Sequence, residues 1–276
     1  MSTANIRFIG GGNMATSLIA GLIADGYEPH SIQVSDPNPE RRHALQARLG
    51  VRALASNVEA LDEAETLVLC VKPQMAASVC AELAPFLAER RPLIVSVMAG
   101  VLEQSIQRWL GASLPIVRAM PNTPAMVQTG AIGLHASPEV DAEGRNRAET
   151  ILRAVGLVRW VESESRIDAV TAISGSGPAY FFLLMEALEQ AAIELGLDTE
   201  TARLLTIQTA LGAAKMAMES DAPPARLREQ VTSPGGTTEC ALKVFDAADL
   251  RALVERAARA AHDRAVELSQ TLSEAP

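Results

Sequence analysis

The sequence predicts a chain of two domains, an α/β N-terminal domain and an all-α C-terminal domain. Short β-branched runs alternate with helical patterns up to about residue 160, which is typical of a parallel sheet with helices on both faces. After about Ser163 the strand signals end, and apolar residues recur at helical spacing. We therefore expect domains at residues 1–162 and 163–276.

Composition narrows the possible functions of the 276 residues. Apolar residues make up 48% of the chain, enough for a sizeable core. The formal net charge of −9 argues against binding to nucleic acid or to an anionic membrane. Three cysteines without a C-x-x-C spacing predict reduced thiols rather than a disulfide framework. No uninterrupted apolar run reaches 18 residues, so we expect a protein without a membrane span, located in the cytoplasm.

The first domain opens with an apolar strand at 6–9 that ends at glycine. Met14, Leu18 and Leu22 then lie on one face of a helix expected at 13–25. The run TLVLCV at 66–71 is nearly all apolar, as in a strand that is buried on both faces. Similar reasoning predicts a helix at 40–49 and further strands at 32–35, 93–97, 116–119, 130–135 and 156–161.

The second domain is expected to be helical throughout. Pro178 suits the first turn of a helix that runs to about Leu195 and stops at Gly196. Asp198 is the expected N-cap of the next helix, and the residues after Ser269 are expected to fray.

Both long helices carry apolar stripes, which either form a core or face a second subunit. A helical domain of this size has little else to bury them against, so both interpretations stay open. The stripes comprise Phe181, Met185, Leu188, Ala192 and Leu195, then Leu204, Ile207, Leu211, Ala214 and Met218.

The segment FIGGGNMA at 8–15 matches G-x-G-x-x-A between a strand and a helix. Gly10 permits a tight turn, Gly12 lets the backbone approach a pyrophosphate, and Ala15 lets the helix lie close to the strand. The free N–H groups at the helix start favour a bound anion. This context predicts a Rossmann-like domain whose cofactor contacts include Gly10, Gly11, Gly12, Asn13 and Met14.

The cofactor type stays open at this point. Asp36 ends the second strand, about where an acid that binds the ribose 2′-hydroxyl is expected, which favours NAD. Asn38, Arg41 and Arg42 follow closely, and an arginine there can pair with the 2′-phosphate of NADP.

Four further loops carry polar groups or exposed N–H groups. VKP at 71–73 and MPNTPA at 120–125 follow strands, where ligands of open α/β sheets lie. SGSGP at 174–178 and VTSPGGTT at 231–238 precede helices and could hold a small anion such as a carboxylate. Each is also compatible with an ordinary turn. Four scattered histidines show no metal-ligand spacing, so no metal site is expected.

Taken together, FIGGGNMA, VKP, MPNTPA, SGSGPAY at 174–180 and VTSPGGTT resemble the pyrroline-5-carboxylate reductase family, the last enzymes of proline synthesis. The resemblance implies an α/β Rossmann-like domain and an all-α dimerisation domain. It implies hydride transfer from a nicotinamide cofactor to a small cyclic imine. Homodimers through the helical domain are implied, and in some members rings of dimers. Family members often use NADPH, whereas Asp36 leaves NADH open.

The resemblance also assigns roles to single residues. Asn57 matches a position near the adenosine ribose, and Val71, Lys72 and Pro73 match the loop beside the nicotinamide. Thr238 and Lys72 are the expected catalytic residues, with Thr238 orienting the ring nitrogen. The substrate carboxylate and ring nitrogen would be held by Ser233, Gly235, Gly236, Thr237 and Thr238.

Two other functions remain as alternatives. A β-hydroxyacid dehydrogenase also joins a Rossmann domain to a helical one, but it needs a catalytic lysine in the helical domain. Lys215 and Lys243 are the lysines there, and neither lies in a glycine-rich loop. A dinucleotide-binding sensor without turnover would not explain the polar loop at 231–238.

Overall fold

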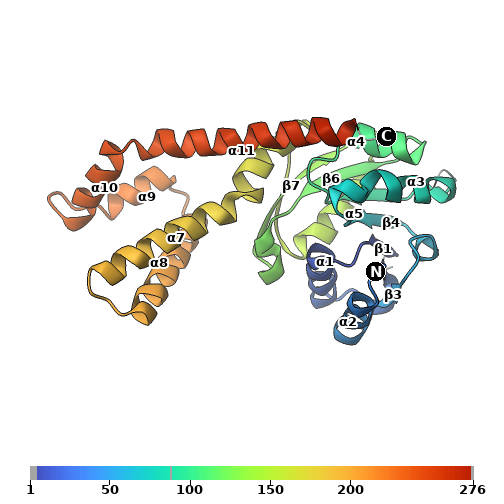
Figure 1. Cartoon of the computed structure of the whole chain (residues 1–276), viewed down its shortest axis with the longest axis horizontal. Helices are drawn as coiled ribbons and strands as arrows, with labels where there is room; N and C mark the ends of the chain where they lie inside the picture. Colours follow the sequence, from blue (N-terminus) through green and yellow to red (C-terminus); the bar gives the residue numbers. More distant parts are fainter. Residues whose placement is uncertain (1–4, 88, 275–276) are drawn as a thin grey trace. The chain divides into compact units, whose positions relative to one another are not determined.

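The computed structural model describes residues 5–87 and 89–274, which form two compact units (Figure 1). Unit 1 joins the residues up to Ser176 to those from Ala261 onward, and unit 2 is Gly177–Ala260. The predicted domain boundary at 162/163 falls just before the first helix that follows the sheet. The compact units divide later, and the domain boundary stays a prediction.

Unit 1 is built on one eight-stranded sheet of the order β3-β2-β1-β4-β5-β6-β7-β8 within the described residues. Neighbouring strands from β3 to β6 are parallel, as predicted. The strands are β1 (Ile6–Ile9), β2 (Ile32–Ser35), β3 (Arg52–Leu54), β4 (Thr66–Leu69), β5 (Leu93–Ser96), β6 (Ile116–Met120), β7 (Gly130–Ala136) and β8 (Gly156–Trp160).

Two features of the sheet differ from the sequence prediction. Strand β7 pairs antiparallel with β6. The connection between them holds only the short 3-10 helix Thr123–Val127, whereas a parallel pair needs a crossover of a dozen or more residues. Strand β3 was not predicted either, because this edge strand has only three residues and begins with the exposed Arg52.

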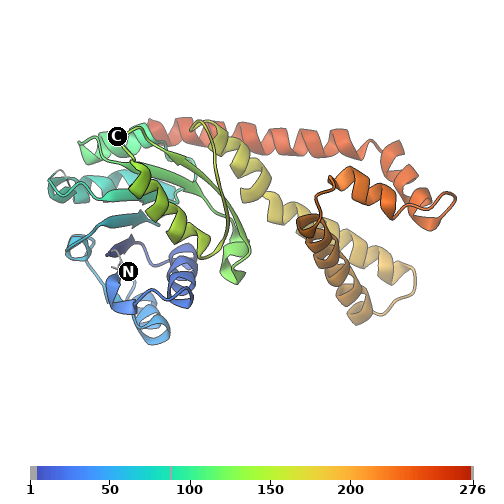
Figure 2. The same ribbon diagram turned by 180° about the vertical axis from the view of Figure 1, so that it is seen from behind.

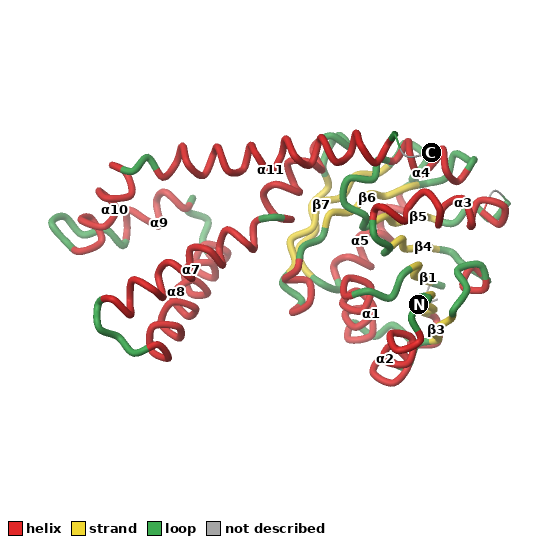
Figure 3. The backbone as a smooth tube through the Cα atoms, viewed as in Figure 1, coloured by secondary structure: helices red, strands yellow, loops and turns green. Residues whose placement is uncertain are grey.

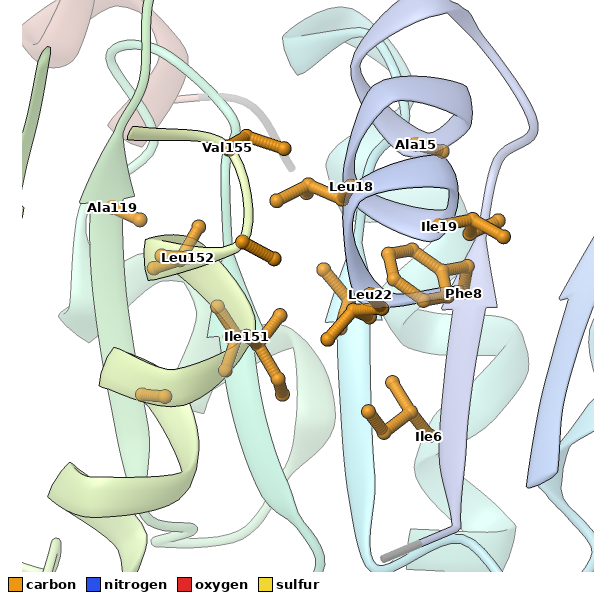
Figure 4. Close-up of a cluster of buried hydrophobic side chains, with 14 of the residues drawn as sticks. Ile6, Phe8, Ala15, Leu18, Ile19, Leu22, Ala119, Ile151, Leu152 and Val155 are labelled. Atoms are coloured by element: carbon orange, nitrogen blue, oxygen red, sulfur yellow. The ribbon is translucent and has the colours of Figure 1, made fainter. Parts of the chain in front are cut away.

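Helices cover both faces of the sheet, and the alternation of side chains along each strand divides the core in two. Ile6 and Phe8 pack with α1 (Asn13–Ala24), α2 (Pro39–Leu49) and α5 (Ala142–Arg153). Figure 4 shows this cluster, and the view from behind shows α5 lying across the sheet (Figure 2). Ile9 lies on the other face, with α3 (Ala76–Leu87) and α4 (Glu103–Leu110). The predicted two-sided burial is therefore confirmed.

The end of α11 (Leu250–Ser273) belongs to unit 1 and is ordered as helix to Ser273. The Nη2 group of Arg108 donates to the carbonyl of Ser273, and Ser269 is buried. The expectation that residues after Ser269 fray is wrong for residues up to Ser273, because side chains on α4 and the second core hold this end of the helix.

Before unit 2, the chain forms α6 (Arg166–Val170) and a π-turn at Thr171–Gly175. Unit 2 then contains α7 (Gly177–Glu194), α8 (Thr199–Glu219), α9 (Pro224–Gln230), α10 (Thr237–Ala247) and the first part of α11. Helices α7 and α8 lie side by side, joined by a short loop (Figure 3).

The predicted helix boundaries in unit 2 are confirmed. Gly196 follows α7 with φ +100°, in the left-handed region that favours glycine. The Asp198 carboxylate accepts from the Thr201 N–H at 3.0 Å, as an N-cap does.

One continuous helical stretch, Arg166–Glu194, is long and apolar enough to cross a membrane by length and composition alone. A single stretch of this kind is weak support for a membrane span, since soluble helices pass the same criterion.

Candidate active site

The turn between β1 and α1 has the geometry that its glycines predict. Gly10 has φ +96°, and an added Cβ would lie 2.8 Å from the Cys70 carbonyl oxygen. Gly12 has φ −73° and caps α1, and an added Cβ would meet no atom within 4 Å. The first N–H groups of α1 therefore border open space, which is the arrangement that binds a phosphate anion.

A cavity of about 630 Å³ lies at this turn, at the carboxyl ends of β1, β2 and β4. This is where ligands of open α/β sheets bind. Eight predicted cofactor residues line it: Gly10, Gly12, Asn13, Asp36, Arg41, Asn57, Val71 and Lys72. Gly11 lines a smaller neighbouring cavity with Arg41. Met14, Asn38 and Pro73 do not line the larger cavity.

Asp36 is buried, and both of its carboxylate oxygens accept hydrogen bonds from the backbone. Oδ2 accepts from the Gly11 N–H at 3.0 Å, and Oδ1 accepts from the Asn38 N–H at 2.8 Å. The side chain is only 4% exposed. Asp36 therefore ties the glycine-rich turn to the turn before α2.

The polar residues after Asp36 have different roles. The Asn38 side chain caps α2 by accepting from the N–H groups of Glu40 and Arg41. Arg42 donates to two backbone carbonyls, those of Asp36 and Pro37. The Arg41 side chain is 58% exposed, and its contact within the described part of the chain is a long one of 3.5 Å to Asp36. Its guanidinium is therefore the cation at this end of the cavity that is open to a ligand.

Asn57 is held in the cavity wall by two partners. Its Oδ1 accepts from the Ser35 hydroxyl, and its Nδ2 donates to the Glu82 carboxylate, both at 2.8 Å. Three further residues that were not predicted line the cavity from α3: Ser78, Val79 and Glu82. Their spacing of three and four residues places them on one face of the helix that follows VKP. This spacing was the sequence feature from which their place in the cavity wall could have been predicted.

The VKP loop forms the rim of the cavity near the end of β4. Lys72 is exposed and precedes the 3-10 helix Pro73–Met75. The neighbouring Cys70 also lines the cavity, but burial raises the pKa of its thiol far above the ordinary value. This shift favours the protonated thiol over the nucleophilic thiolate.

The predicted substrate loop forms a defined turn in unit 2. The Gly236 N–H donates to the Ser233 carbonyl at 3.0 Å, with Pro234 and Gly235 between them. Gly235 has φ +72°, so the turn needs glycine at this position.

Helix α10 begins directly after this turn, at Thr237 and Thr238. The N–H groups of a first helical turn have no intrahelical acceptor. By contrast, the Gly235 N–H already donates to the Glu239 carboxylate at 2.8 Å. The backbone donors open to a small anion therefore include those of Thr237, Thr238 and Glu239, beside the hydroxyls of the two threonines.

Two family models match the chain. A pyrroline-5-carboxylate reductase dimerisation model matches residues 164–268, and a model described as NADP oxidoreductase coenzyme F420-dependent matches residues 5–100. A pyrroline-5-carboxylate reductase from Pseudomonas aeruginosa is 51% identical over 99% of this chain and all of its own length.

Solved structures agree with this match. A pyrroline-5-carboxylate reductase from Coxiella burnetii is 50% identical, with a TM-score of 0.93 over 97% of this chain and 99% of its own. A Plasmodium falciparum pyrroline carboxylate reductase with NADP bound is 27% identical, with a TM-score of 0.86 over 98% of this chain and 99% of its own. The chain therefore belongs to the pyrroline-5-carboxylate reductase family, oxidoreductases that catalyse the final step of proline biosynthesis.

Proposed function

We propose that this oxidoreductase reduces the C=N bond of 1-pyrroline-5-carboxylate with a hydride from NADPH and releases L-proline. The observation that carries the proposal is the open face of Gly12 at the start of α1. A pyrophosphate can approach the backbone there, beside a cavity of about 630 Å³. The glycine-rich turn, the cavity and Arg41 fit a phosphorylated dinucleotide.

NADPH is favoured over NADH because of what surrounds Asp36. A carboxylate that selects NADH must offer an oxygen to the ribose 2′-hydroxyl, whereas the Asp36 side chain is only 4% exposed and is turned toward two backbone N–H groups. Arg41 is 58% exposed, and a guanidinium suits a 2′-phosphate. The NADP bound to the Plasmodium falciparum relative supports the same choice.

When bound, the reduced nicotinamide supplies the hydride, which C5 of the cyclic imine accepts. Protonation of the ring nitrogen to the iminium makes C5 a better hydride acceptor. Lys72 stands exposed at the rim of the cavity, where its charge would attract anionic ligands. Lys72 and Thr238 stay the proposed catalytic residues.

The proposed substrate contacts lie at the start of α10. The N–H groups of Thr237 and Thr238 hold the substrate carboxylate, and the Thr238 hydroxyl hydrogen-bonds the ring nitrogen. A threonine hydroxyl is not acidic at neutral pH, so Thr238 positions the nitrogen rather than donating a proton as a general acid. Ser233, Gly235 and Gly236 maintain the turn in front of these donors.

Unit 2 supports a homodimer because it has almost no interior of its own. Within Gly177–Ala260, Gly177, Ala202 and Thr206 are the buried residues. Phe181, Phe182 and Leu183 of α7 are 64%, 63% and 66% exposed. Apolar surface of this extent needs a cover, and the dimerisation model that matches this region supports a second copy of the chain. Rings of such dimers belong to the same proposal, as does a cytoplasmic location.

The test is to mix the purified protein with pyrroline-5-carboxylate and to follow the absorbance of NADPH and NADH in parallel. We expect faster consumption of NADPH, with proline formed in equal amount. Turnover of a 3-hydroxy acid instead would support the hydroxyacid dehydrogenase alternative. Cofactor binding without any turnover would support the sensor alternative and contradict the proposal.

A further inference from the structure

Two loops that the sequence analysis singled out, MPNTPA after β6 and SGSGP before α7, are joined by one side chain. The Nδ2 group of Asn122 donates to the backbone carbonyl of Ser174 at 2.9 Å. The two residues lie far apart in the sequence, and both belong to unit 1. None of the residues proposed to bind the cofactor or the substrate takes part in this hydrogen bond.

The Asn122 amide is fixed at both of its ends. Its Oδ1 accepts from the N–H of Ala131 in β7 at 3.0 Å, while Nδ2 faces the Ser174 carbonyl. The residue is 8% exposed. Because one partner is a donor and the other an acceptor, the amide satisfies both in only one orientation.

The Ser174 carbonyl lies in a helical turn that has lost a regular donor. Thr171–Gly175 form a π-turn, in which the Ser176 N–H donates to the Thr171 carbonyl at 2.8 Å. In an α-helix the Ser174 carbonyl would accept from residue 178, which is Pro178 and has no N–H. The Asn122 side chain supplies a donor to this carbonyl.

Side-chain packing holds the same turn against the sheet. A Cβ on Gly133 of β7 would lie 2.6 Å from Cγ2 of Val170, just before the π-turn. A Cβ on Gly175 would lie 2.6 Å from Cε of Met120, at the end of β6. Both glycines therefore allow a close approach that the hydrogen bonds of Asn122 then fix.

The π-turn lies near the end of the sheet where the nicotinamide is expected to bind. Asp36 and Arg41 follow β2, so the adenosine end of the cofactor lies on the β2 side of β1. The nicotinamide end then lies toward β4, β5 and β6, whose carboxyl ends share one edge of the sheet. Asn122 follows β6, and it holds Ser174–Ser176 at this end.

We propose that Asn122 is a positioning residue of the reductase, which fixes the π-turn at Thr171–Gly175 and thereby the backbone of Ser174–Ser176 beside the nicotinamide end of the cofactor site. π-turns inside helices occur frequently at functional sites. The inference rests on the proposed function. It requires Asn122 to affect the hydride-transfer step more than cofactor binding, since the adenosine and pyrophosphate contacts lie on other strands.

The test compares Asn122→Ala and Asn122→Asp with the wild type and with Thr129→Ala, a matched control. Thr129 lies in the same β6–β7 connection and is exposed, and its hydroxyl makes a long 3.4 Å bond to the Pro124 carbonyl that alanine would remove without touching the backbone. For each protein we would measure kcat and KM for pyrroline-5-carboxylate, the NADPH Kd from cofactor fluorescence, and the circular dichroism spectrum. We expect both Asn122 variants to lose about tenfold or more in kcat, with the NADPH Kd within about twofold of wild type. Thr129→Ala should keep the wild-type values.

Asn122→Asp adds a signature that general destabilisation would not give. The ionised carboxylate of this variant could still accept from the Ala131 N–H, but it would repel the Ser174 carbonyl oxygen. The protonated carboxylic acid has an O–H group that can donate to this carbonyl again. Burial raises the pKa of an aspartic acid, which brings this protonation into a measurable range. The kcat of the variant, divided by that of wild type at each pH, should therefore rise as the pH falls from 8 to 5.5.

Three results would overturn the inference: unchanged kcat in Asn122→Asp, an equal loss of kcat and NADPH affinity, or a kcat ratio that does not change with pH. If Asn122→Ala fails to fold, Asn122→Asp decides by the same criteria, and failure of both to fold would show a purely structural role. A wild-type protein that does not reduce pyrroline-5-carboxylate would contradict the proposed function instead, so the two failures are distinguishable.

Discussion

At the scale of single residues, we expect Arg41 to determine the proposed preference for NADPH. Arg41→Ala removes a cation that can form charge-assisted hydrogen bonds to a 2′-phosphate, each worth about 1.5–3 kcal/mol. We expect the NADPH Kd to rise about 10- to 100-fold and the NADH Kd to stay within about twofold. Cofactor fluorescence titrations measure both values. His43→Ala, an exposed change on the same helix, is the control. An equal loss of affinity for both cofactors would show that Arg41 does not contact the 2′-phosphate.

Thr238 carries the second prediction at this scale. Thr238→Ala removes the hydroxyl that we propose orients the ring nitrogen, so kcat should fall about tenfold or more while the NADPH Kd is unchanged. Thr238→Ser keeps the hydroxyl and should recover most of the turnover. Steady-state kinetics with pyrroline-5-carboxylate measure the difference. If the alanine and serine variants are equally impaired, the methyl group rather than the hydroxyl matters, and the assigned role is wrong.

At the scale of elements, substitutions of two glycines in the β1–α1 turn should affect cofactor binding and stability differently. Gly12→Ala places a methyl group in open space without backbone strain, so the melting temperature should fall by no more than about 3 °C, the cost of a poorer N-cap. The methyl group occupies the space that a pyrophosphate needs, and the cofactor Kd should rise at least about tenfold. Gly10→Ala forces a Cβ to within 2.8 Å of the Cys70 carbonyl oxygen at φ +96° and should lower the melting temperature. Calorimetry and fluorescence titration of both variants test this contrast. Full cofactor affinity in Gly12→Ala would exclude close pyrophosphate contact.

Glu103 at the start of helix α4 predicts that the stability of the fold depends on pH. Burial, reinforced by Glu164 and Glu139, raises the pKa of the Glu103 carboxyl from 4.5 to about 7. Between these values the folded protein keeps a proton that the unfolded chain has released, so this group lowers the stability as the pH rises. Glu103→Gln removes the ionisable carboxyl and with it this loss of stability at high pH. Its melting temperature should match wild type near pH 4.5 and exceed it by roughly 2–6 °C at pH 8.

Thermal scans at several pH values test this expectation. Gln104→Ala, an exposed neighbour without a titratable group, should differ from wild type by the same amount at every pH. A melting-temperature difference for Glu103→Gln that does not change with pH would contradict the raised pKa.

At the scale of the whole molecule, the exposed apolar surface of unit 2 predicts a homodimer. Leu183 is 66% exposed and lines a groove of about 790 Å³ with Phe182 and Ile207. Leu183→Glu adds a charge to this surface and should weaken association without unfolding the chain. Leu157→Glu makes the same change on the edge strand β8, where the leucine is 57% exposed, and is the control. Light scattering should show twice the 29.2 kDa chain mass, or a multiple of this dimer mass if the dimers form rings, for wild type and control, and a loss of that species for Leu183→Glu. A dimer that Leu183→Glu leaves intact would place the interface elsewhere.

Much of the fold could be predicted from the sequence because its signals are local. The strands at 6–9 and 32–35 and the N-cap at Asp198 follow from apolar runs, turns and capping chemistry. The glycine-rich turn was predictable for the same reason, since φ at Gly10 and the open face at Gly12 depend on neighbouring residues. By contrast, the antiparallel β7 and the short edge strand β3 depend on pairing with distant segments, which the periodicity of one segment does not encode.

The sequence by itself determined the two-part architecture, the dinucleotide motif and the family resemblance, because each rests on the order and spacing of residues along the chain. Only the tertiary structure decided what the polar side chains do. It showed that the Asp36 carboxylate holds two turns together, that Glu82 supports Asn57, and that Asn122 joins two loops. A side chain's hydrogen-bond partners come from segments that folding brings together. The same carboxylate or amide can therefore bind a ligand or hold the backbone, and the distances between atoms decide which.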